Sequence, residues 1–286
     1  MNLQLAHNNY GESRIRLLRV MRRGSVHELK DLTLSIHFEG DFDTAHTAGD
    51  NRKILPANTM TNTVYVLARQ YPAEAVEEFA LHIVEHFLTY NPQLSRIRVT
   101  ASERLWSRIL IAEKPHASAF VSHAGERRIT HITATREHTI LQSGIENLLV
   151  LKTTGAGFEG FLRDPYTTIQ QASDSVISAD INATWTYETS ESEAPYSAAW
   201  HGIRKILLET FAHHEGRSLQ HTVYAMGQAV LDNFEALAEI RLTLADNLYA
   251  PVDLKPFGME NESEVFMPVE EPRESIEATL RRESSH

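Results

Sequence analysis

Hydrophobic and polar residues alternate near the start of the chain in the way that is typical of half-buried β-strands. Between residues 32 and 39, the apolar side chains Leu, Leu, Ile and Phe fall on one face, and Thr, Ser, His and Glu fall on the other. A second alternation covers residues 13–21, and residues 22–25 between the two runs include the glycine of a tight turn. The pattern predicts that the chain opens with a long antiparallel hairpin.

Helices are predicted where apolar residues recur with the helical period. Three stretches have this pattern: residues 76–87, residues 199–213 and the run from Ser218 to Val230. The hydroxyl of Ser218 is suited to cap the N-terminus of the third helix. Further strands are expected at residues 95–102, 126–136, 146–153, 181–189, 239–245 and 275–281, with a loop at residues 253–264.

Each half of the chain therefore repeats one order, in which two strands are followed by helical sequence and then by two more strands. Strands that pair as hairpins around helices indicate an α+β fold, with antiparallel sheets and helices on one face. The strands and helices do not alternate one by one, so a Rossmann fold is not expected. We expect a first domain at residues 8–138, a second domain at residues 139–282 and a short tail at residues 283–286.

Composition narrows the classes of function. The 286 residues include 38 acidic and 27 basic side chains, a formal net charge of −11, which disfavours binding to nucleic acid. The chain has no cysteine, which excludes disulfides, thiol catalysis and Cys-ligated metal. No apolar run is long enough to span a membrane, and the start of the chain lacks the apolar core of a signal peptide. The last residues, Ser284-Ser285-His286, lack the Ser-Lys-Leu signal, so we expect a cytoplasmic location and no membrane partner.

One short motif has the spacing of a metal site. His82, Glu85 and His86 match the inverted zincin pattern H-x-x-E-H, in which two His one helical turn apart bind zinc beside a general-base Glu. The same three residues also flank the apolar stripe of the helix predicted at residues 76–87, where they form its solvent face. A catalytic zinc needs at least one more ligand, and nothing in the sequence identifies it, so no metal is expected.

Several segments, in order along nearly the whole chain, resemble the urate oxidase (uricase) family. They include Asn-Tyr-Gly at residues 9–11, Thr-Ala-Gly-Asp-Asn at 47–51, Asn-Thr-Val-Tyr at 62–65, Gly-Phe-Leu-Arg-Asp at 160–164, Tyr-Thr-Thr at 166–168 and Ile-Glu-Ala-Thr at 276–279. The resemblance implies two tandem tunnelling-fold (T-fold) domains per subunit, in a homotetramer whose stacked sheets enclose a tunnel. It also implies oxidation of a purine-type heterocycle by O₂ without a cofactor, at active sites that two chains share.

The residues that carry out the family's chemistry differ in this chain. The resemblance implies a catalytic Lys at the position of Glu12, and a Thr followed by an Asp at the positions of Ala57 and Asn58. It implies a proton-carrying His at the position of Leu248, in a loop whose family Asn corresponds to Asp246. A Leu side chain cannot transfer a proton, so the family's proton relay is not present in its usual form.

The residues that bind the substrate are kept only in part. By the resemblance, Phe158 stacks on the heterocycle, and Gln220, with Leu219 beside it, reads one edge of the ring. The Arg that clamps the opposite edge of urate corresponds to Ser175. Charge-assisted hydrogen bonds are about twice as strong as neutral ones, so this change should weaken the binding of an anion. The two new carboxylates also reverse the charge of the pocket, so a neutral or cationic ring is expected to suit it better than urate.

Three functions follow from this comparison of residues. In the first, the chain is an oxidase or related enzyme that acts on a different planar N-heterocycle, with Glu12 or Asp246 as its base. In the second, it is a catalytically inert paralogue that binds a purine-like ligand or has a structural role. In the third, it is a genuine urate oxidase with an unusual proton relay. The expected partners are a small planar heterocycle, O₂ for an oxidase, and further copies of the chain.

Overall fold

The computed structural model describes residues 3–72, 74–172, 174–189, 194–247, 249–269 and 274–283. Contacts between Cα atoms divide the chain into two compact units. Unit 1 comprises Met1–Gly144 and Thr186–Trp200, and unit 2 comprises Ile145–Trp185 and His201–His286. The domain boundaries expected from the sequence stay predictions.

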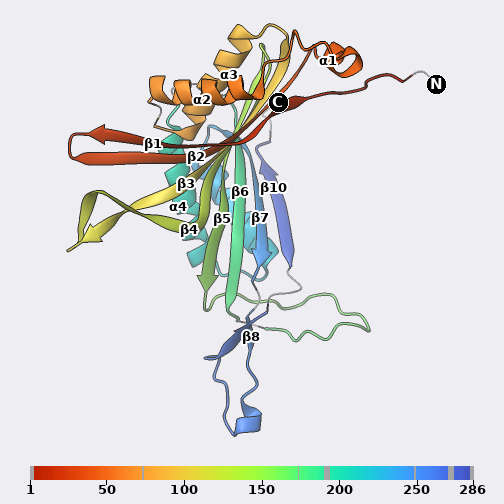
Figure 1. Ribbon diagram of the computed structural model, residues 1–286. Coiled ribbons are helices and arrows are strands. Elements are labelled where there is room, and N and C mark those ends of the chain that lie inside the picture. The colour runs from red at the N-terminus through yellow and green to blue at the C-terminus, as the bar shows by residue number, and fades with distance from the viewer. Residues whose placement is uncertain are drawn as a thin grey trace. The chain divides into compact units, whose positions relative to one another are not determined.

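Four consecutive strands in the described part of unit 1 pair in antiparallel fashion, and the helices lie between the two hairpins in the chain (Figure 1). The strand order is β1-β2-β3-β4, so each strand pairs with its neighbour in the sequence. The predicted opening hairpin and the predicted helix at residues 76–87 are confirmed. The elements are β1 (Tyr10–Arg23), β2 (Val26–Gly40), α1 (Asp43–Ala48), α2 (Ala57–Gln70), α3 (Val76–Tyr90), β3 (Leu94–Ile111) and β4 (Lys114–Ala134).

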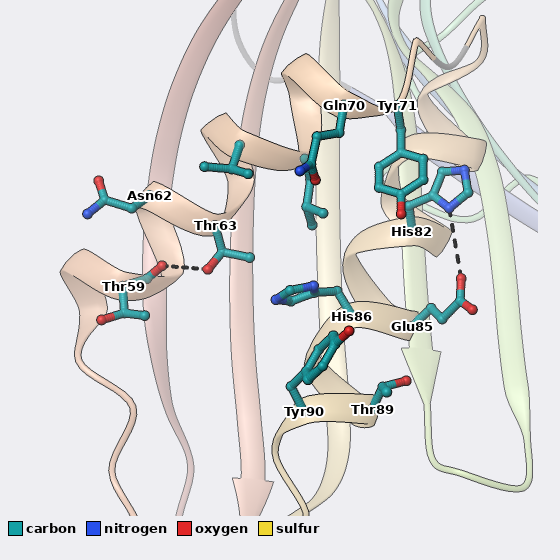
Figure 2. Close-up of a pocket in the computed structure, with 12 residues that line it drawn as sticks. Thr59, Asn62, Thr63, Gln70, Tyr71, His82, Glu85, His86, Thr89 and Tyr90 are labelled. Atoms are coloured by element: carbon teal, nitrogen blue, oxygen red, sulfur yellow. Dashed lines mark hydrogen bonds and ion pairs between the residues drawn. The ribbon is translucent and has the colours of Figure 1, made fainter.

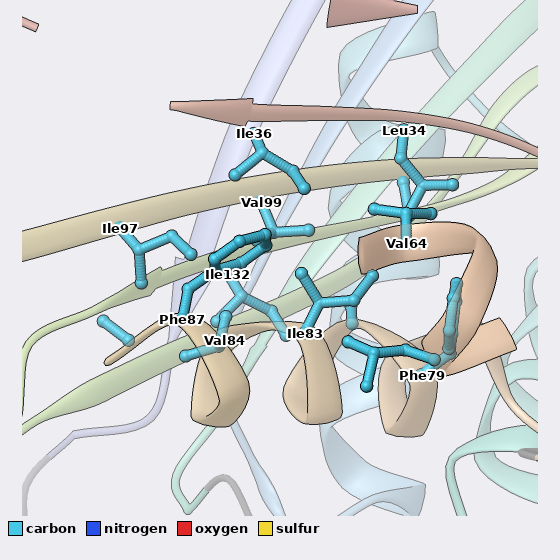
Figure 3. Close-up of a cluster of buried hydrophobic side chains, with 14 of the residues drawn as sticks. Leu34, Ile36, Val64, Phe79, Ile83, Val84, Phe87, Ile97, Val99 and Ile132 are labelled. Carbon is cyan, nitrogen blue, oxygen red and sulfur yellow. The ribbon is translucent and has the colours of Figure 1, made fainter. Parts of the chain in front are cut away.

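The core of unit 1 lies between one face of these strands and the helices that cover it (Figure 3). Ile36 of β2 lies opposite Val99 of β3, and Val99 lies opposite Ile132 of β4, so the three side chains form a row across the sheet. All three are buried, and so are Ile83 and Phe87 of α3, which face them in Figure 3. Burial of one such side chain contributes about 1.5–3 kcal/mol relative to exposure.

Helices α1 and α2 are not among the elements that the sequence pattern predicts. The sequence of α2 is rich in Thr and Asn, whose side chains compete with the helical backbone for hydrogen bonds. Its buried residues Met60, Val64 and Leu67 nevertheless follow the helical spacing and join the core of unit 1. Burial of this stripe, rather than intrinsic propensity, therefore explains the helix.

Unit 2 repeats the arrangement with its own strands and helices. Its strands follow in the order β5-β6-β7-β10, and α5 packs against β7 and β10. The alternation predicted for β6 is confirmed, because Ile181, Ala183 and Trp185 are all buried. The elements are β5 (Thr139–Lys152), β6 (Ile177–Tyr187), α4 (Tyr196–His213), α5 (Leu219–Asn233), β7 (Leu237–Asp246), β8 (Tyr249–Pro251), the short 3-10 helix η1 (Lys255–Phe257), β9 (Phe266–Pro268) and β10 (Ser275–Arg281). Of these, β5 and α4 begin in unit 1, and β6 ends in it.

Candidate functional site

The predicted site residues of unit 1 gather where β1 approaches the start of α2. Glu12 follows Tyr10 and Gly11 on β1, and a Cβ at Gly11 would lie only 2.0 Å from the carbonyl oxygen of Ile36. The phenol oxygen of Tyr10 accepts a hydrogen bond from the Leu55 amide at 2.9 Å, two residues before α2 begins. Burial raises the pKa of Tyr10. This bond ties the segment that carries Glu12 to the N-terminus of α2.

Glu12 lies immediately before a β-bulge. It is opposite Ile36, whereas Ile15 is opposite Leu34, so β1 has one extra residue between them. Within the bulge, Arg14 adopts a φ of 62°, in the left-handed region. The Glu12 side chain is half-buried. Bulges of this kind change the direction of neighbouring side chains and are frequent beside active sites.

Ala57 and Asn58 form the first turn of α2, and both are exposed. The Asn58 Oδ1 accepts a hydrogen bond from Nδ2 of Asn62 at 3.0 Å. Ala57 offers only a methyl group where the resemblance implies a hydroxyl. The structure therefore links the strand segment of Glu12 to the segment that leads into Ala57 and Asn58. The functional groups that these three side chains supply are one carboxylate and one amide.

In unit 2, the residues that follow β5 are held by the carboxylate of Asp174. It accepts a hydrogen bond from the Thr154 hydroxyl at 2.5 Å and one from the Gly155 amide at 2.6 Å. The amides of Ala156 and Ser175 also donate to it. These bonds, the one from Thr154 first, hold the pKa of Asp174 below its ordinary value. The φ of 77° at Gly155 allows the chain to turn at this point.

Phe158, the predicted stacking residue, is fixed by its main chain while its ring stays accessible. Its N–H and C=O exchange hydrogen bonds with those of Ala172, at 2.7 and 3.1 Å. The side chain is 40% exposed and stacks on Phe161, with the ring centroids 4.8 Å apart. The neighbouring Gly157 amide donates to the Gly216 carbonyl at 2.9 Å, which ties this segment to the residues that lead into α5. An accessible ring on a fixed backbone is suited to stack on a planar ligand.

The Ser175 hydroxyl is engaged with the backbone, because it donates to the Ala156 carbonyl oxygen at 3.1 Å. A depression of about 630 Å³ adjoins this segment, and its wall includes Asp174, Glu159 and Glu215. Arg217 also lines it. Among the described residues, the wall of this depression therefore carries more negative than positive charge.

Leu219 and Gln220 open helix α5. Ser218 caps this helix as predicted, since its hydroxyl oxygen accepts a hydrogen bond from the His221 amide at 3.1 Å. Leu219 is buried, whereas Gln220 is exposed. The Nε2 of Gln220 donates to Oε1 of Glu274 at 3.3 Å. The amide that was predicted to read a ring edge is thus held by a carboxylate.

Asp246 ends β7 beside the same glutamate. Its amide donates to the carbonyl oxygen of Glu274 at 2.9 Å. The next residue, Asn247, is held by Asp180, which accepts from its Nδ2 at 3.2 Å. Leu248 lies outside the described residues. Glu274 is a candidate that the sequence analysis missed, because it belongs to no motif and precedes a short strand.

The predicted residues therefore fall into two groups, one in each unit, and in each unit hydrogen bonds of these residues or of their chain neighbours fix the backbone that carries them. The group of unit 1 comprises Glu12, Ala57 and Asn58, and the group of unit 2 comprises Phe158, Ser175, Leu219, Gln220 and Asp246.

Comparison with known proteins decides the family. The family model for uricase matches residues 8–133 and 141–277. The chain belongs to the uricase family. The uricase of Arthrobacter globiformis is 38% identical over 281 residues, which cover 98% of this chain and 91% of that protein. The uricase of Dictyostelium discoideum is 31% identical over 284 residues, 98% of each chain.

A crystal structure of the Arthrobacter globiformis uricase matches this uricase-family chain with a TM-score of 0.93 and 37% identity, over 100% of this chain and 97% of that chain. The α+β class and the T-fold expected from the sequence are confirmed. The roles of the individual site residues stay predictions. In the described part of the chain, no helix is both long and apolar enough to cross a membrane.

A second concave region of this uricase-family chain is a groove of about 660 Å³ between α2 and α3 (Figure 2). The ring of His82 stacks on Tyr71 at 4.3 Å between centroids, and its Nδ1 lies 3.9 Å from Glu85. His86 packs against Tyr90, and burial lowers the pKa of its imidazole. Among the described residues, no three His, Asp or Glu side chains are grouped so that they could hold a metal ion. The zincin interpretation of this motif therefore lacks the third ligand that it requires.

Proposed function

We propose that this uricase-family chain binds a neutral or cationic planar N-heterocycle, oxidises it with O₂ without a cofactor, and is not an efficient urate oxidase. The observation that carries the proposal is the Ser175 hydroxyl, which donates to the Ala156 carbonyl where the resemblance implies an Arg. Without that cation, an anion such as urate loses a pair of charge-assisted hydrogen bonds. Glu12 and Asp246, in place of a Lys and an Asn, add negative charge.

The parts of the site that stack on a ring and read its edge support a planar ligand. Phe158 has an accessible ring on a backbone held by Ala172, and Gln220 projects from the capped first turn of α5. By the resemblance, two chains of a homotetramer share each active site. We therefore propose that Glu12, Ala57 and Asn58 act at the site of a neighbouring subunit.

A carboxylate is the base proposed for this reaction. Glu12 or Asp246 takes a proton from the ring, in the role of a general base. The heterocycle gives up two electrons and two protons in all, and O₂ accepts them and leaves as hydrogen peroxide. Glu12→Gln or Asp246→Asn should therefore abolish turnover and leave the tetramer intact, as checked by light scattering after size-exclusion chromatography. Full activity in both variants would show that the base is another group.

The deciding experiment is O₂ uptake by the purified protein with saturating urate, run beside the Arthrobacter globiformis uricase. We expect a rate at least about 10²-fold below that control, because a positioned proton carrier contributes roughly 10²–10⁴-fold to such rates. Robust uptake would overturn the proposal. Neutral oxopurines and pterins are tested next, with hydrogen peroxide formation as the readout.

Urate oxidation itself is the second candidate function. Relatives named uricase match 98% of this chain at 38% and 31% identity, which is the observation in its favour. Robust O₂ uptake with urate would select this candidate. An inert paralogue predicts instead that no heterocycle of the panel supports O₂ uptake, although the tetramer forms and a ring is bound.

A further inference from the structure

We infer that Glu274 acts with Gln220 to select a heterocycle that carries an amidine edge, meaning a ring N–H beside an exocyclic amino group. This inference rests on the proposed function, in which a planar ring stacks on Phe158. The chemical class is the 2-amino-4-oxopyrimidine ring, alone or fused within a purine or a pteridine. Glu274 is a specificity-determining residue in this view.

The hydrogen bond between the two side chains determines what they present to a ligand. The Nε2 of Gln220 donates to Oε1 of Glu274 at 3.3 Å. A carboxylate accepts from N–H and never from C=O, so this bond fixes which end of the amide faces Glu274. Within the part of the chain that the structure describes, no group donates to Oε2 of Glu274. The pair therefore offers two acceptors, the Gln220 carbonyl oxygen and the free carboxylate oxygen.

Both residues stand on fixed backbone. The Asp246 amide donates to the Glu274 carbonyl at 2.9 Å, and the next residue, Ser275, pairs with Ala245 in the ladder of β10 and β7. Gln220 lies in the first turn of α5, which Ser218 caps. A side chain on a fixed backbone loses less conformational freedom when it binds, which favours its use in recognition.

Phe158, the proposed stacking residue, lies next to a residue that is hydrogen-bonded to the segment leading into Gln220. The amide of Gly157, next to Phe158, donates to Gly216 at 2.9 Å, four residues before Gln220. This bond ties the Phe158 segment to the segment that leads into Gln220. In the inferred site, a ring stacked on Phe158 places its edge against Gln220 and Glu274. Two N–H donors on the edge of that ring match the two acceptors in number and kind.

Charge favours the same class of ligand. Ser175 is neutral, and its hydroxyl is bonded to the backbone. The adjoining depression is lined by three acidic side chains and one basic side chain: Glu159, Asp174, Glu215 and Arg217. A carboxylate at a ring edge attracts N–H donors through charge-assisted hydrogen bonds and repels an anionic edge such as that of urate. A ligand with an oxo group at position 2, in place of the amino group, presents an acceptor where the other presents a donor. Two acceptors, the oxo group and the Glu274 carboxylate, would then face and repel each other.

The test compares pterin with lumazine, two pteridines that differ in having an amino or an oxo group at position 2. Isothermal titration calorimetry with the full chain at neutral pH should show pterin binding about tenfold tighter or more, as expected for one charge-assisted hydrogen bond gained. The Glu274→Gln variant should lose most of this preference. Glu274 is exposed, so this change leaves the fold intact.

Glu277→Gln is the matched control. Glu277 lies on β10, three residues after Glu274, is also exposed, and pairs with Arg241 at 2.5 Å instead of with Gln220. The preference for pterin should persist in this variant. Equal or tighter binding of lumazine by the wild type, or a preference unchanged in Glu274→Gln, would overturn the inference and leave the proposed heterocycle site standing. Binding of neither ring would overturn the inference, and O₂ uptake with the oxopurines of the panel would then decide the proposed function separately.

Discussion

The guanidinium of Arg128 and the carboxylate of Glu77 form a buried ion pair in unit 1, with side chains 3% and 0% exposed. The Arg128 Nη2 lies 2.6 Å from one oxygen of Glu77, and the Ser143 hydroxyl donates to the other oxygen at 2.5 Å. The Trp200 ring lies 5.5 Å from the guanidinium carbon. Glu77 is in the first turn of α3 and Arg128 is on β4, so the pair joins the helix to the sheet.

Arg128→Met should lower the free energy of unfolding by about 3–5 kcal/mol, because it leaves the Glu77 carboxylate buried without a cation. The double variant Glu77→Leu, Arg128→Met should recover most of this loss, since it removes both charges. Urea unfolding followed by circular dichroism measures both. Lys205→Met is the control, because it breaks an ion pair at the surface: Lys205 is 72% exposed and its partner Glu209 is 56% exposed. This variant should lower the free energy of unfolding by less than about 0.5 kcal/mol. A double variant as unstable as Arg128→Met would contradict this account.

The Asp174 carboxylate should hold the turn that leads to Phe158 in its folded conformation. Its pKa is lowered because its hydrogen bonds favour the charged form, so the stabilisation is present above the ordinary carboxyl pKa and is lost as pH falls through the lowered value. Asp174→Asn should increase hydrogen exchange at the Gly155 and Ala156 amides at neutral pH. Acidification of the wild type should have the same effect. Mass spectrometry of the peptide around residues 152–158 makes the measurement.

A matched change for this experiment is Asp253→Asn, because Asp253 also accepts a backbone hydrogen bond, from the Lys255 amide at 3.1 Å, in a different loop. That variant should leave exchange around residues 152–158 unchanged. Equal protection of this peptide in wild type and Asp174→Asn would show that other contacts, such as the Gly157 bond to Gly216, hold the turn by themselves.

The periodic parts of the fold could be predicted from the sequence because each strand has one buried face, as Ile181 and Trp185 of β6 illustrate. Helix α2 could not, because its Thr and Asn residues favour other conformations and only its packing makes it helical. In the candidate site, too, some residues could be predicted from the sequence and others could not. Phe158 and Gln220 follow from the family's motifs, whereas Glu274 becomes visible only through a contact with a residue 54 positions away.

Phe158→Leu should weaken the binding of any planar heterocycle by about 1–3 kcal/mol, the usual worth of stacking between an aromatic side chain and a base. The melting temperature should change little, because the Phe158 side chain is 40% exposed and the leucine keeps the backbone bonds to Ala172. Calorimetric titration with pterin and thermal unfolding measure the two effects. Tyr166→Leu, in the same segment and 89% exposed, should leave the affinity unchanged. A Phe158→Leu variant with wild-type affinity would remove this ring from the binding site.

Ser175→Arg tests the origin of the expected discrimination against urate. The position is exposed, so the longer side chain has room, and the variant gives up only the neutral bond to the Ala156 carbonyl. A guanidinium there can donate two parallel hydrogen bonds to an anionic ring edge, worth about 1.5–3 kcal/mol, which corresponds to roughly a 10- to 100-fold gain in urate affinity. Ser175→Gln, which has donors but no charge, should give a much smaller gain. Calorimetric titration with urate compares the wild type with the two variants. The same affinity in all three proteins would mean that position 175 does not face the ligand. The loss of the family's Arg would then not explain the expected discrimination against urate.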